Sequence, residues 1–397
     1  MTERRVDPDA CVLCGACRAV CPIFMETLRE CDVARGRVAR VKYTGQQERF
    51  TAADREAFSL CLMCGRCLEV CKADLDIPHL MQRARAESGY AAGIPRLVAE
   101  TLAKHPSRLS TVARLAATWH KWLARLPEDS GLRRRLGDSY LSAGRLLPSP
   151  PADPYLARQL GRRAQGDRKL ALFAGCGAGW LLSEIGDAID AILAALDLVA
   201  AVPAQNCCGL PAWGLGADDA ADAGFAAWRE AFSGNGYEAV LTPCASCAAH
   251  LQEHLGEGAE TPLEEFFVWL ARQELAVDLS GVKLAVHVPC HTRRGVRGGD
   301  AVTPMLREAG AEIVELPTAL DEQCCGMGGT FGAQHTDLSR RIGLPKVDAM
   351  LEAEPAAIVS HCTGCLLQLR DLVRYRGSSV PVAHPVQWLA KGLTGRT

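Results

Sequence analysis

The feature that most constrains this chain is a pair of four-cysteine motifs near its start. Each has the spacing C-x2-C-x2-C-x3-C, with Cys11, Cys14, Cys17 and Cys21 in the first motif and Cys61, Cys64, Cys67 and Cys71 in the second. At this spacing three thiolates of one motif bind one [4Fe-4S] cube, and the fourth reaches a neighbouring cube. The crossed pattern predicts one cluster on Cys11, Cys14, Cys17 and Cys71 and another on Cys61, Cys64, Cys67 and Cys21.

A pair of zinc sites is the alternative for these eight cysteines. Zinc takes four ligands, usually from two C-x2-C pairs, so it leaves the regular third and fourth cysteines of each motif unexplained. We therefore favour two [4Fe-4S] clusters.

The length and composition bound what surrounds these motifs. A chain of 397 residues is long enough for two to three domains, and its formal charge of -2 gives no reason to expect nucleic acid as a partner. The N-terminus lacks an apolar leader, and the most apolar stretch, residues 188–204, is interrupted by Asp190 and Asp197. With 19 cysteines and no leader, we expect a protein of the reducing cytoplasm, soluble or peripheral on the inner face of the membrane.

The C-terminal half is an internal repeat. Residues 169–176 match 283–290, residues 206–214 match 323–331, and residues 239–247 match 357–365. Short continuous apolar runs at residues 170–173, 198–202 and 239–241 are typical of buried parallel strands. The chain is therefore predicted to be an α+β multidomain protein, with an α-helical two-cluster ferredoxin domain followed by two repeated α/β domains with short parallel sheets.

Five cysteines recur in each repeat, and they follow the apolar runs. The first set is Cys176, Cys207, Cys208, Cys244 and Cys247; the second set is Cys290, Cys324, Cys325, Cys362 and Cys365. Because the C-terminal ends of parallel strands meet at one edge of a sheet, each set should converge there. Five thiols exceed the four that a cube uses, which favours a noncubane cluster in each repeat. A disulfide or zinc role for the vicinal pair is the alternative.

We expect four segments along the chain. They are the ferredoxin domain (1–95), a helical linker region (96–167), a first repeat domain (168–279) and a second (280–397). The linker contains an apolar stripe with Trp119 and Trp122. We favour intramolecular packing for this stripe over docking to a membrane or a partner.

Three further features are given lesser roles. Cys31 is left over once the clusters are filled, and it is interpreted as a small apolar side chain. The segment 175–179 resembles a dinucleotide loop, but its glycine spacing is wrong and a cysteine occupies its centre. His291 and His361 stand next to proposed ligands, where they could tune a cluster or donate protons, although simple packing is the more common role.

Taken together, these motifs resemble the CCG-domain iron–sulfur oxidoreductases. That family includes the iron–sulfur subunits of anaerobic glycerol-3-phosphate dehydrogenase and of glycolate oxidase, and the catalytic subunit of heterodisulfide reductase. The loop 324–332 and the tail 383–390 are most similar to the first of these. Lys72 stands where proline usually follows the second motif, and Ala34 where glycolate oxidase subunits tend to have proline.

The resemblance implies a subunit that passes electrons from a partner flavoprotein dehydrogenase, of the glycerol-3-phosphate, glycolate or lactate type, to quinone or another membrane-bound acceptor. The chain has no convincing flavin or nicotinamide fingerprint of its own, which agrees with the need for a partner. The alternative is a thiol–disulfide reductase with noncubane clusters, since all five cysteines are kept in both repeats. A zinc-stapled scaffold without redox activity is a third interpretation.

Overall fold

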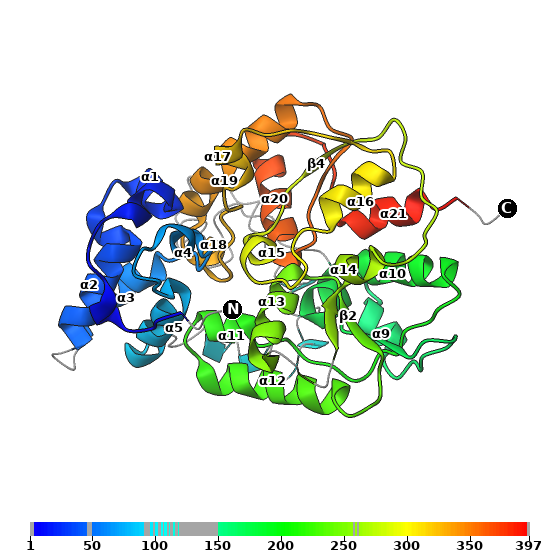
Figure 1. Ribbon diagram of the computed structural model, residues 1–397, viewed down its shortest axis with the longest axis horizontal. Coiled ribbons are helices and arrows are strands. Elements are labelled where there is room, and N and C mark those ends of the chain that lie inside the picture. Colours follow the sequence, from blue (N-terminus) through cyan, green and yellow to red (C-terminus); the bar gives the residue numbers. More distant parts are fainter. Residues whose placement is uncertain are drawn as a thin grey trace.

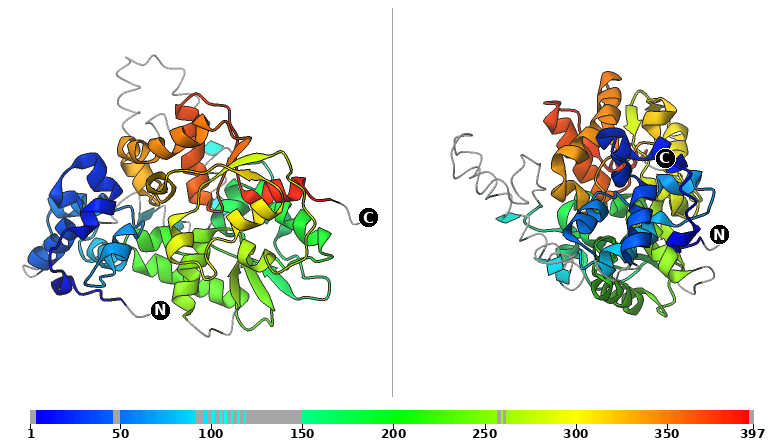
Figure 2. Two further views of the ribbon diagram at one scale, coloured as in Figure 1. Left: turned by 45° about the horizontal axis from the view of Figure 1, so that its top comes forward. Right: turned by 90° about the vertical axis from the view of Figure 1, so that its left-hand side faces the viewer.

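The computed structural model describes residues 4–45, 50–90, 150–256, 259 and 262–394, with scattered positions between 96 and 118. A helical N-terminal unit lies at one end, and two α/β units pack against each other beside it (Figure 1). The views in Figure 2 keep this arrangement, with the blue N-terminal unit next to both the green and the orange units. The predicted fold class is confirmed. Trp119 and Trp122, which carry the predicted apolar stripe, lie outside the described residues.

The N-terminal unit is built from short helices around a small apolar core. Its helices are η1 (Pro8–Ala10), η2 (Ala16–Val20), α1 (Pro22–Thr27), η3 (Glu30–Asp32), α2 (Ala34–Gly45), α3 (Ala52–Ser59), α4 (Arg66–Val70) and α5 (Ile77–Glu87). Helix α5 begins at Ile77 because Asp76 accepts a hydrogen bond from the amide of His79 and proline occupies the first turn. Buried Val38, Phe58 and Leu80 hold α2, α3 and α5 together.

The first α/β unit has a three-stranded parallel sheet in the order β1-β2-β3. Its elements are α9 (Tyr155–Gln159), β1 (Leu170–Leu172), η4 (Gly177–Leu181), α10 (Glu184–Ala195), α11 (Leu210–Gly214), α12 (Asp218–Phe232), β2 (Ala239–Thr242), α13 (Ala245–Leu255), β3 (Leu263–Glu265) and α14 (Phe266–Leu270). Strands β1 and β2 are completely buried, as continuous apolar runs predict.

The second α/β unit repeats this plan with a four-stranded parallel sheet in the order β5-β4-β6-β7. Its elements are β4 (Lys283–Val286), α15 (Cys290–Arg294), α16 (Val302–Glu308), β5 (Glu312–Ile313), α17 (Thr318–Asp321), α18 (Phe331–Gln334), α19 (Thr336–Glu352), β6 (Ala357–Val359), α20 (Thr363–Tyr375), β7 (Val382–Ala383) and α21 (Pro385–Lys391).

One predicted strand is shorter than expected. Residues 198–202 form a single parallel bridge, in which Ala201 pairs with Ala171 of β1. The neighbouring Val199 instead pairs antiparallel with Gln165, and the amide of Val202 donates to the carbonyl of Arg162. The backbone hydrogen bonds of this run are thus shared between β1 and the segment that precedes it, which prevents a regular ladder.

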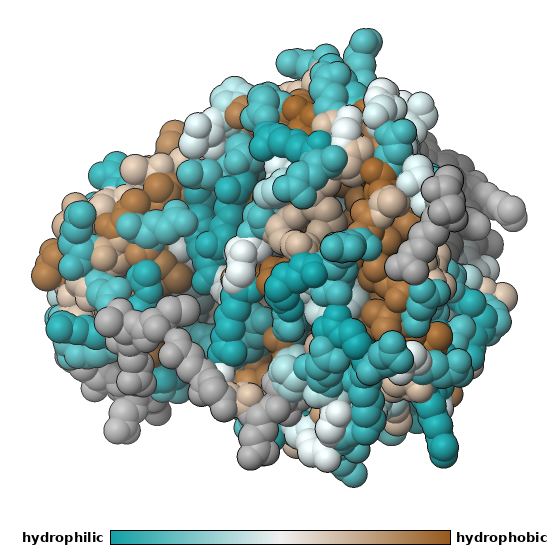
Figure 3. Space-filling view, turned by 45° about the vertical axis from the view of Figure 1, so that its right-hand side comes forward, coloured by the Kyte–Doolittle hydropathy of each residue, from teal (hydrophilic) through white to brown (hydrophobic). Residues whose placement is uncertain are grey.

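The two α/β units share one apolar core. Helix α10 of the first unit packs against α21 at the end of the second, and Arg370 of α20 pairs with Glu184 of α10 at 3.0 Å. Hydrophilic residues cover most of the face seen in Figure 3, with apolar residues gathered in patches between them. Among the described residues, no helix is both long and apolar enough to cross a membrane.

Candidate metal centres

The two N-terminal cysteine loops have the same backbone path. Leu13 and Gly15 in the first loop have φ of 55° and 84°, and Met63 and Gly65 in the second have φ of 57° and 74°. A left-handed conformation is unfavourable for leucine and methionine, so its recurrence at equivalent positions indicates that both loops are shaped for the same purpose. Each loop leads into a short helix, η2 or α4, that begins after the glycine.

The N-terminal thiols lie in two sets, and the fourth cysteine of each motif lies with the first three of the other motif. A cavity is lined by Cys11, Cys14, Cys17 and Cys71, with Cys67 also at its wall. The remaining thiols also lie close to one another. Burial raises the pKa of Cys67 well above its usual value, and the charges of nearby Cys64, Cys61 and Cys21 add to this rise. This placement agrees with the crossed pattern of ligands, which itself remains a prediction.

The ten thiols of the α/β units form one connected series. In the first unit the Sγ atoms of Cys176 and Cys207 are 3.7 Å apart, and the contacts continue through Cys208 and Cys247 to Cys244. In the second unit the series begins at Cys290, which contacts Cys324, and continues to the adjacent Cys325. The Sγ of Cys325 lies 3.4 Å from the Sγ of Cys365, and Cys365 contacts Cys362. Each predicted set therefore converges, in the same order in both repeats.

The two sets meet at Cys244 and Cys362. These thiols contact each other, and donation to Cys244 from neighbouring thiols holds its pKa well below the usual value. Hydroxyl groups also join the two units here: Ser246 Oγ lies 3.1 Å from the Sγ of Cys362, and Thr363 Oγ1 lies 3.5 Å from the Sγ of Cys244. The two cysteine sets are therefore continuous across the boundary between the two α/β units.

The N-terminal unit brings its second thiol set up to the second α/β unit. Burial, followed by the charge of Cys324, raises the pKa of Cys64 to about 12. The hydrogen bond with Cys324 and burial raise the pKa of Cys290, and the charge of Cys64 adds to that rise. Ion pairs flank the contact, from Arg294 to Glu69 at 2.9 Å and from Arg66 to Glu322 at 3.3 Å. Thiols of the N-terminal unit and of the second α/β unit are thus close enough to affect one another.

These donor sets fit iron–sulfur clusters. All 19 cysteines lie in described residues and each is a free thiol. In the α/β units four of the five thiols of each set are buried. Such groups repel one another as thiolates unless a cation neutralises them, and binding of iron would release their protons. A tetrahedral zinc ion would use four thiols per set and leave one buried thiol without a role.

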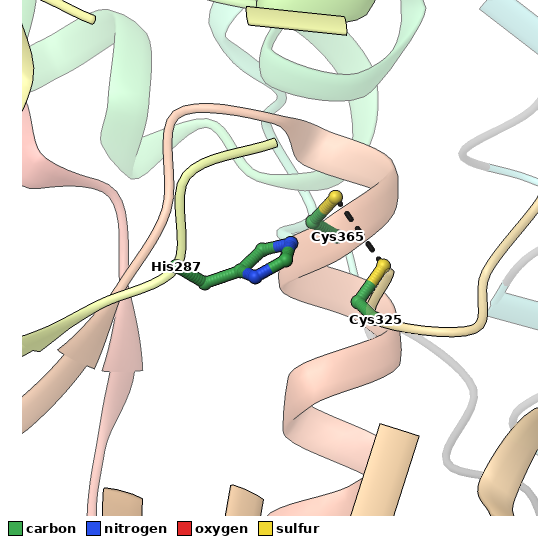
Figure 4. Close-up of side chains that lie close together, drawn as sticks. All are labelled: His287, Cys325 and Cys365. Atoms are coloured by element: carbon green, nitrogen blue, oxygen red, sulfur yellow. Dashed lines mark hydrogen bonds between the residues drawn. The ribbon is translucent and has the colours of Figure 1, made fainter. Parts of the chain in front are cut away.

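Two residues near the second set were missed by the sequence reasoning. His287 lies just after β4, and its ring nitrogen and the Sγ atoms of Cys325 and Cys365 all lie within 4.8 Å of one another (Figure 4). Lys346 of α19 is fully buried, with its Nζ 3.2 Å from His287 Nδ1. The match between the repeats could have pointed to His287, because the first repeat has a phenylalanine, Phe173, at the equivalent position.

The other singled-out residues have ordinary partners. His291 Nδ1 lies 2.8 Å from Ser246 Oγ, and His361 Nε2 lies 2.7 Å from Thr292 Oγ1. Cys31 differs from the expected buried apolar side chain: it is half-buried, and its Sγ donates to Asp32 at 3.3 Å. It belongs to neither N-terminal set.

Comparison with known proteins adds to this geometry. A family model described as a 4Fe-4S dicluster domain matches residues 7–75, and one described as a cysteine-rich domain (CCG) matches residues 170–252 and 284–370. The chain is 26% identical over 391 residues to the glycolate oxidase iron-sulfur subunit of Escherichia coli (strain K12), covering 92% of this chain and 90% of that protein.

Two further relatives cover different parts of the chain. Lactate utilization protein A of Geobacillus kaustophilus is 31% identical over 234 residues, which are 54% of this chain and 96% of that protein. One of the fumarate reductase (CoM/CoB) subunits of Methanothermobacter marburgensis is 23% identical over 377 residues, covering 92% of this chain and 68% of that protein.

Proposed function

This chain belongs to the family of lactate utilization protein A and also carries a 4Fe-4S dicluster domain, and from that premise we propose its place in electron transfer. It is an iron–sulfur subunit of an oxidoreductase. Its role is to carry electrons from a flavoprotein dehydrogenase that oxidises a small hydroxylated substrate, of the glycolate, lactate or glycerol-3-phosphate type, to quinone.

The proposed ligands follow from the thiol sets. Cys11, Cys14, Cys17 and Cys71 would hold one [4Fe-4S] cluster and Cys61, Cys64, Cys67 and Cys21 the other, while the five thiols of each repeat would hold a noncubane cluster. Bound there, these groups supply one-electron transfer. The observation that carries the proposal is the continuity of the thiols. Cys67 and the exposed Cys14 line one cavity, Cys67 lies near Cys64, and Cys64 lies near the series that begins at Cys290.

The outer end of this series supports docking of the flavoprotein. Cys14 is exposed, and beside it Val12 and Leu13 are 72% and 46% exposed. Exposed apolar side chains beside an exposed redox site favour a contact with a partner at this loop. We place the entry of electrons here, and quinone reduction at the α/β units, through peripheral association with the membrane.

The test is reduction of the reconstituted chain, followed by visible absorption and EPR. We expect glycolate, lactate or glycerol 3-phosphate to reduce it only when the co-purifying flavoprotein is present, and a soluble quinone analogue to reoxidise it. Oxidation of any of these substrates by the isolated chain with a dye acceptor would refute the assignment, because the substrate site would then belong to this chain.

A second candidate function is disulfide reduction, and the junction at Cys244 and Cys362 favours it. There both five-thiol sets converge on one point, as cleavage of a bound disulfide by two clusters would require. Reduced viologen with a heterodisulfide substrate tests this function in the unmodified protein and in Cys325→Ala. Activity that the substitution removes supports it, and no activity in the unmodified protein rejects it.

A further inference from the structure

The two repeats differ at one position beside their cysteine sets. Phe173 and His287 each stand three residues before the first cysteine of the repeat. Their amides make the same hydrogen bond, Phe173 to the carbonyl of Leu241 and His287 to that of Val359, both at 2.8 Å. The positions are therefore structurally equivalent, although one holds an aromatic hydrocarbon and the other a hydrogen-bonding ring.

The surroundings of the two side chains differ in the same way. Phe173 packs edge-on against Trp228 and Phe232 of α12, with ring centroids 6.3 Å and 5.6 Å away. In the second repeat the corresponding helix, α19, brings Lys346 to His287 instead. An apolar cluster in one repeat is thus replaced by an ammonium and an imidazole in the other.

Lys346 is buried without a carboxylate as its hydrogen-bond partner. Its Nζ donates to the carbonyl of Asp321 at 2.6 Å and lies 3.2 Å from Nδ1 of His287. Burial lowers the pKa of Lys346 to about 8, which leaves it protonated at neutral pH, and the charge of Asp321, followed by those of Cys325 and Cys324, opposes the shift. A buried ammonium is costly. The negative charges of Asp321 and of the nearby sulfurs of Cys325 and Cys324 partly offset that cost here.

This contact fixes the orientation of the imidazole. An ammonium has no acceptor, so Lys346 must donate to Nδ1, and the ring proton is then on Nε2. His287 Nε2 is buried and has no hydrogen-bond partner among the described residues. The ring lies against the two sulfurs of Cys325 and Cys365, as Figure 4 shows. The Nε2–H group of His287 is therefore a buried donor that could donate a hydrogen bond to a sulfur atom of a cluster held by these cysteines.

We propose that His287, oriented by Lys346, donates a hydrogen bond to sulfur in the cluster of the second repeat, and that this gives the two repeats unequal reduction potentials. The proposal rests on the function proposed above, in which the repeat cysteines hold clusters. Hydrogen bonds to sulfur and nearby positive charge stabilise the more negative, reduced state. The second set, which also adjoins Cys64, is therefore reduced more readily than the first, where Phe173 supplies no donor.

Redox titration followed by EPR tests the proposal in the full chain. The signal of the second repeat is assigned as the one lost in Cys325→Ser and kept in Cys208→Ser. In His287→Phe and in Lys346→Met we expect an equilibrium constant for reduction of that centre at least tenfold smaller, or ~59 mV for one electron. The matched control is Lys283→Gln, which removes a charge from the half-buried start of β4 and should leave the potential unchanged.

Iron content separates the outcomes. Full iron with a lowered potential in either variant supports the donor role, and Lys346→Met provides this result even if His287→Phe does not fold. Full iron with unchanged potentials overturns the inference and leaves the proposed function intact. Loss of iron from the second set in folded His287→Phe makes His287 a ligand, which also overturns it. Absence of iron from that set in the unmodified protein refutes both proposals.

Discussion

At the scale of single residues, Cys64 joins the N-terminal unit to the rest of the molecule. Its thiol lies near Cys61 and Cys21, and also near Cys324 of the second repeat, whose charge adds to burial in raising the pKa of Cys64. The regular spacing of the motifs was enough to predict the first two neighbours. It could not predict Cys324, because that contact depends on how two units dock, and no local pattern records such packing.

Replacement of Cys64 should remove a cluster and destabilise the N-terminal unit together. In Cys64→Ser we expect loss of one cluster's iron and sulfide and a melting temperature lower by about 5 °C or more, because metal binding contributes directly to folding of a small cysteine-rich unit. Cys31→Ser is the matched control, since Cys31 lies outside both sets. Normal iron content and melting in Cys64→Ser would contradict the ligand assignment.

Glu265 is a buried carboxyl group whose protonation is linked to stability. One of its oxygens accepts hydrogen bonds from the amides of Phe267 and Val268 at the start of α14, while the other has no partner among the described residues. Burial raises the pKa of Glu265 to about 8 from 4.5. The folded protein therefore binds a proton more tightly than the unfolded chain does.

The consequence is a loss of stability as pH rises. The contribution of protonated Glu265 is fully present below pH 4.5 and is lost as pH rises through about 8. Glu265→Gln keeps an acceptor for the two amides but cannot ionise, so its melting temperature should fall less between about pH 5 and about pH 8. Thermal unfolding across this range checks the effect. The neighbouring, half-buried Glu264 is the control, and Glu264→Gln should follow the unmodified protein.

At the scale of elements, periodicity and spacing predicted most of what positions the cysteines. Strands β1 and β2 lie where the sequence indicates, since each is a short run of apolar residues that are all buried. Residues 198–202 were predicted less well, because their hydrogen bonds are divided between two partners. The pairing of α10 with α21 is a contact between repeats and has no counterpart in a local pattern.

The exposed tip of the first cysteine loop gives a prediction about partner binding. Val12 lies beside exposed Cys14 and would be covered by the flavoprotein. Val12→Glu should slow electron delivery by about tenfold, or ~1.4 kcal/mol, because a carboxylate would be desolvated in the contact. Stopped-flow reduction by the flavoprotein measures this effect. Iron content should stay normal, and Leu160→Glu, exposed in another unit, should leave the rate unchanged. An unaffected rate in Val12→Glu would place the docking surface elsewhere.

At the scale of the whole molecule, the N-terminal unit is held against both α/β units. Leu62 lies against Gly328, where an added Cβ would come within 2.7 Å of its side chain, and Ser59 Oγ lies 2.8 Å from His335 Nε2. On the other side Gly216 packs closely on the backbone of α5. These contacts fix the second N-terminal thiol set beside the second repeat, so electron transfer between them needs no movement of units.

The two ion pairs at this contact should therefore control transfer between units without affecting cluster assembly. In Glu69→Lys combined with Glu322→Lys, Arg294 and Arg66 each face a like charge where each had a carboxylate partner. We expect the docking to weaken by ~1–2 kcal/mol, since the carboxylates are half-exposed. Freeze-quench EPR after rapid reduction should then show electrons retained on the N-terminal clusters. Glu238→Lys, which reverses a surface pair with Arg168 inside the first unit, is the control. Transfer at the normal rate in the double variant would mean that the apolar contact around Leu62 and Gly328 is enough to hold the two thiol sets together.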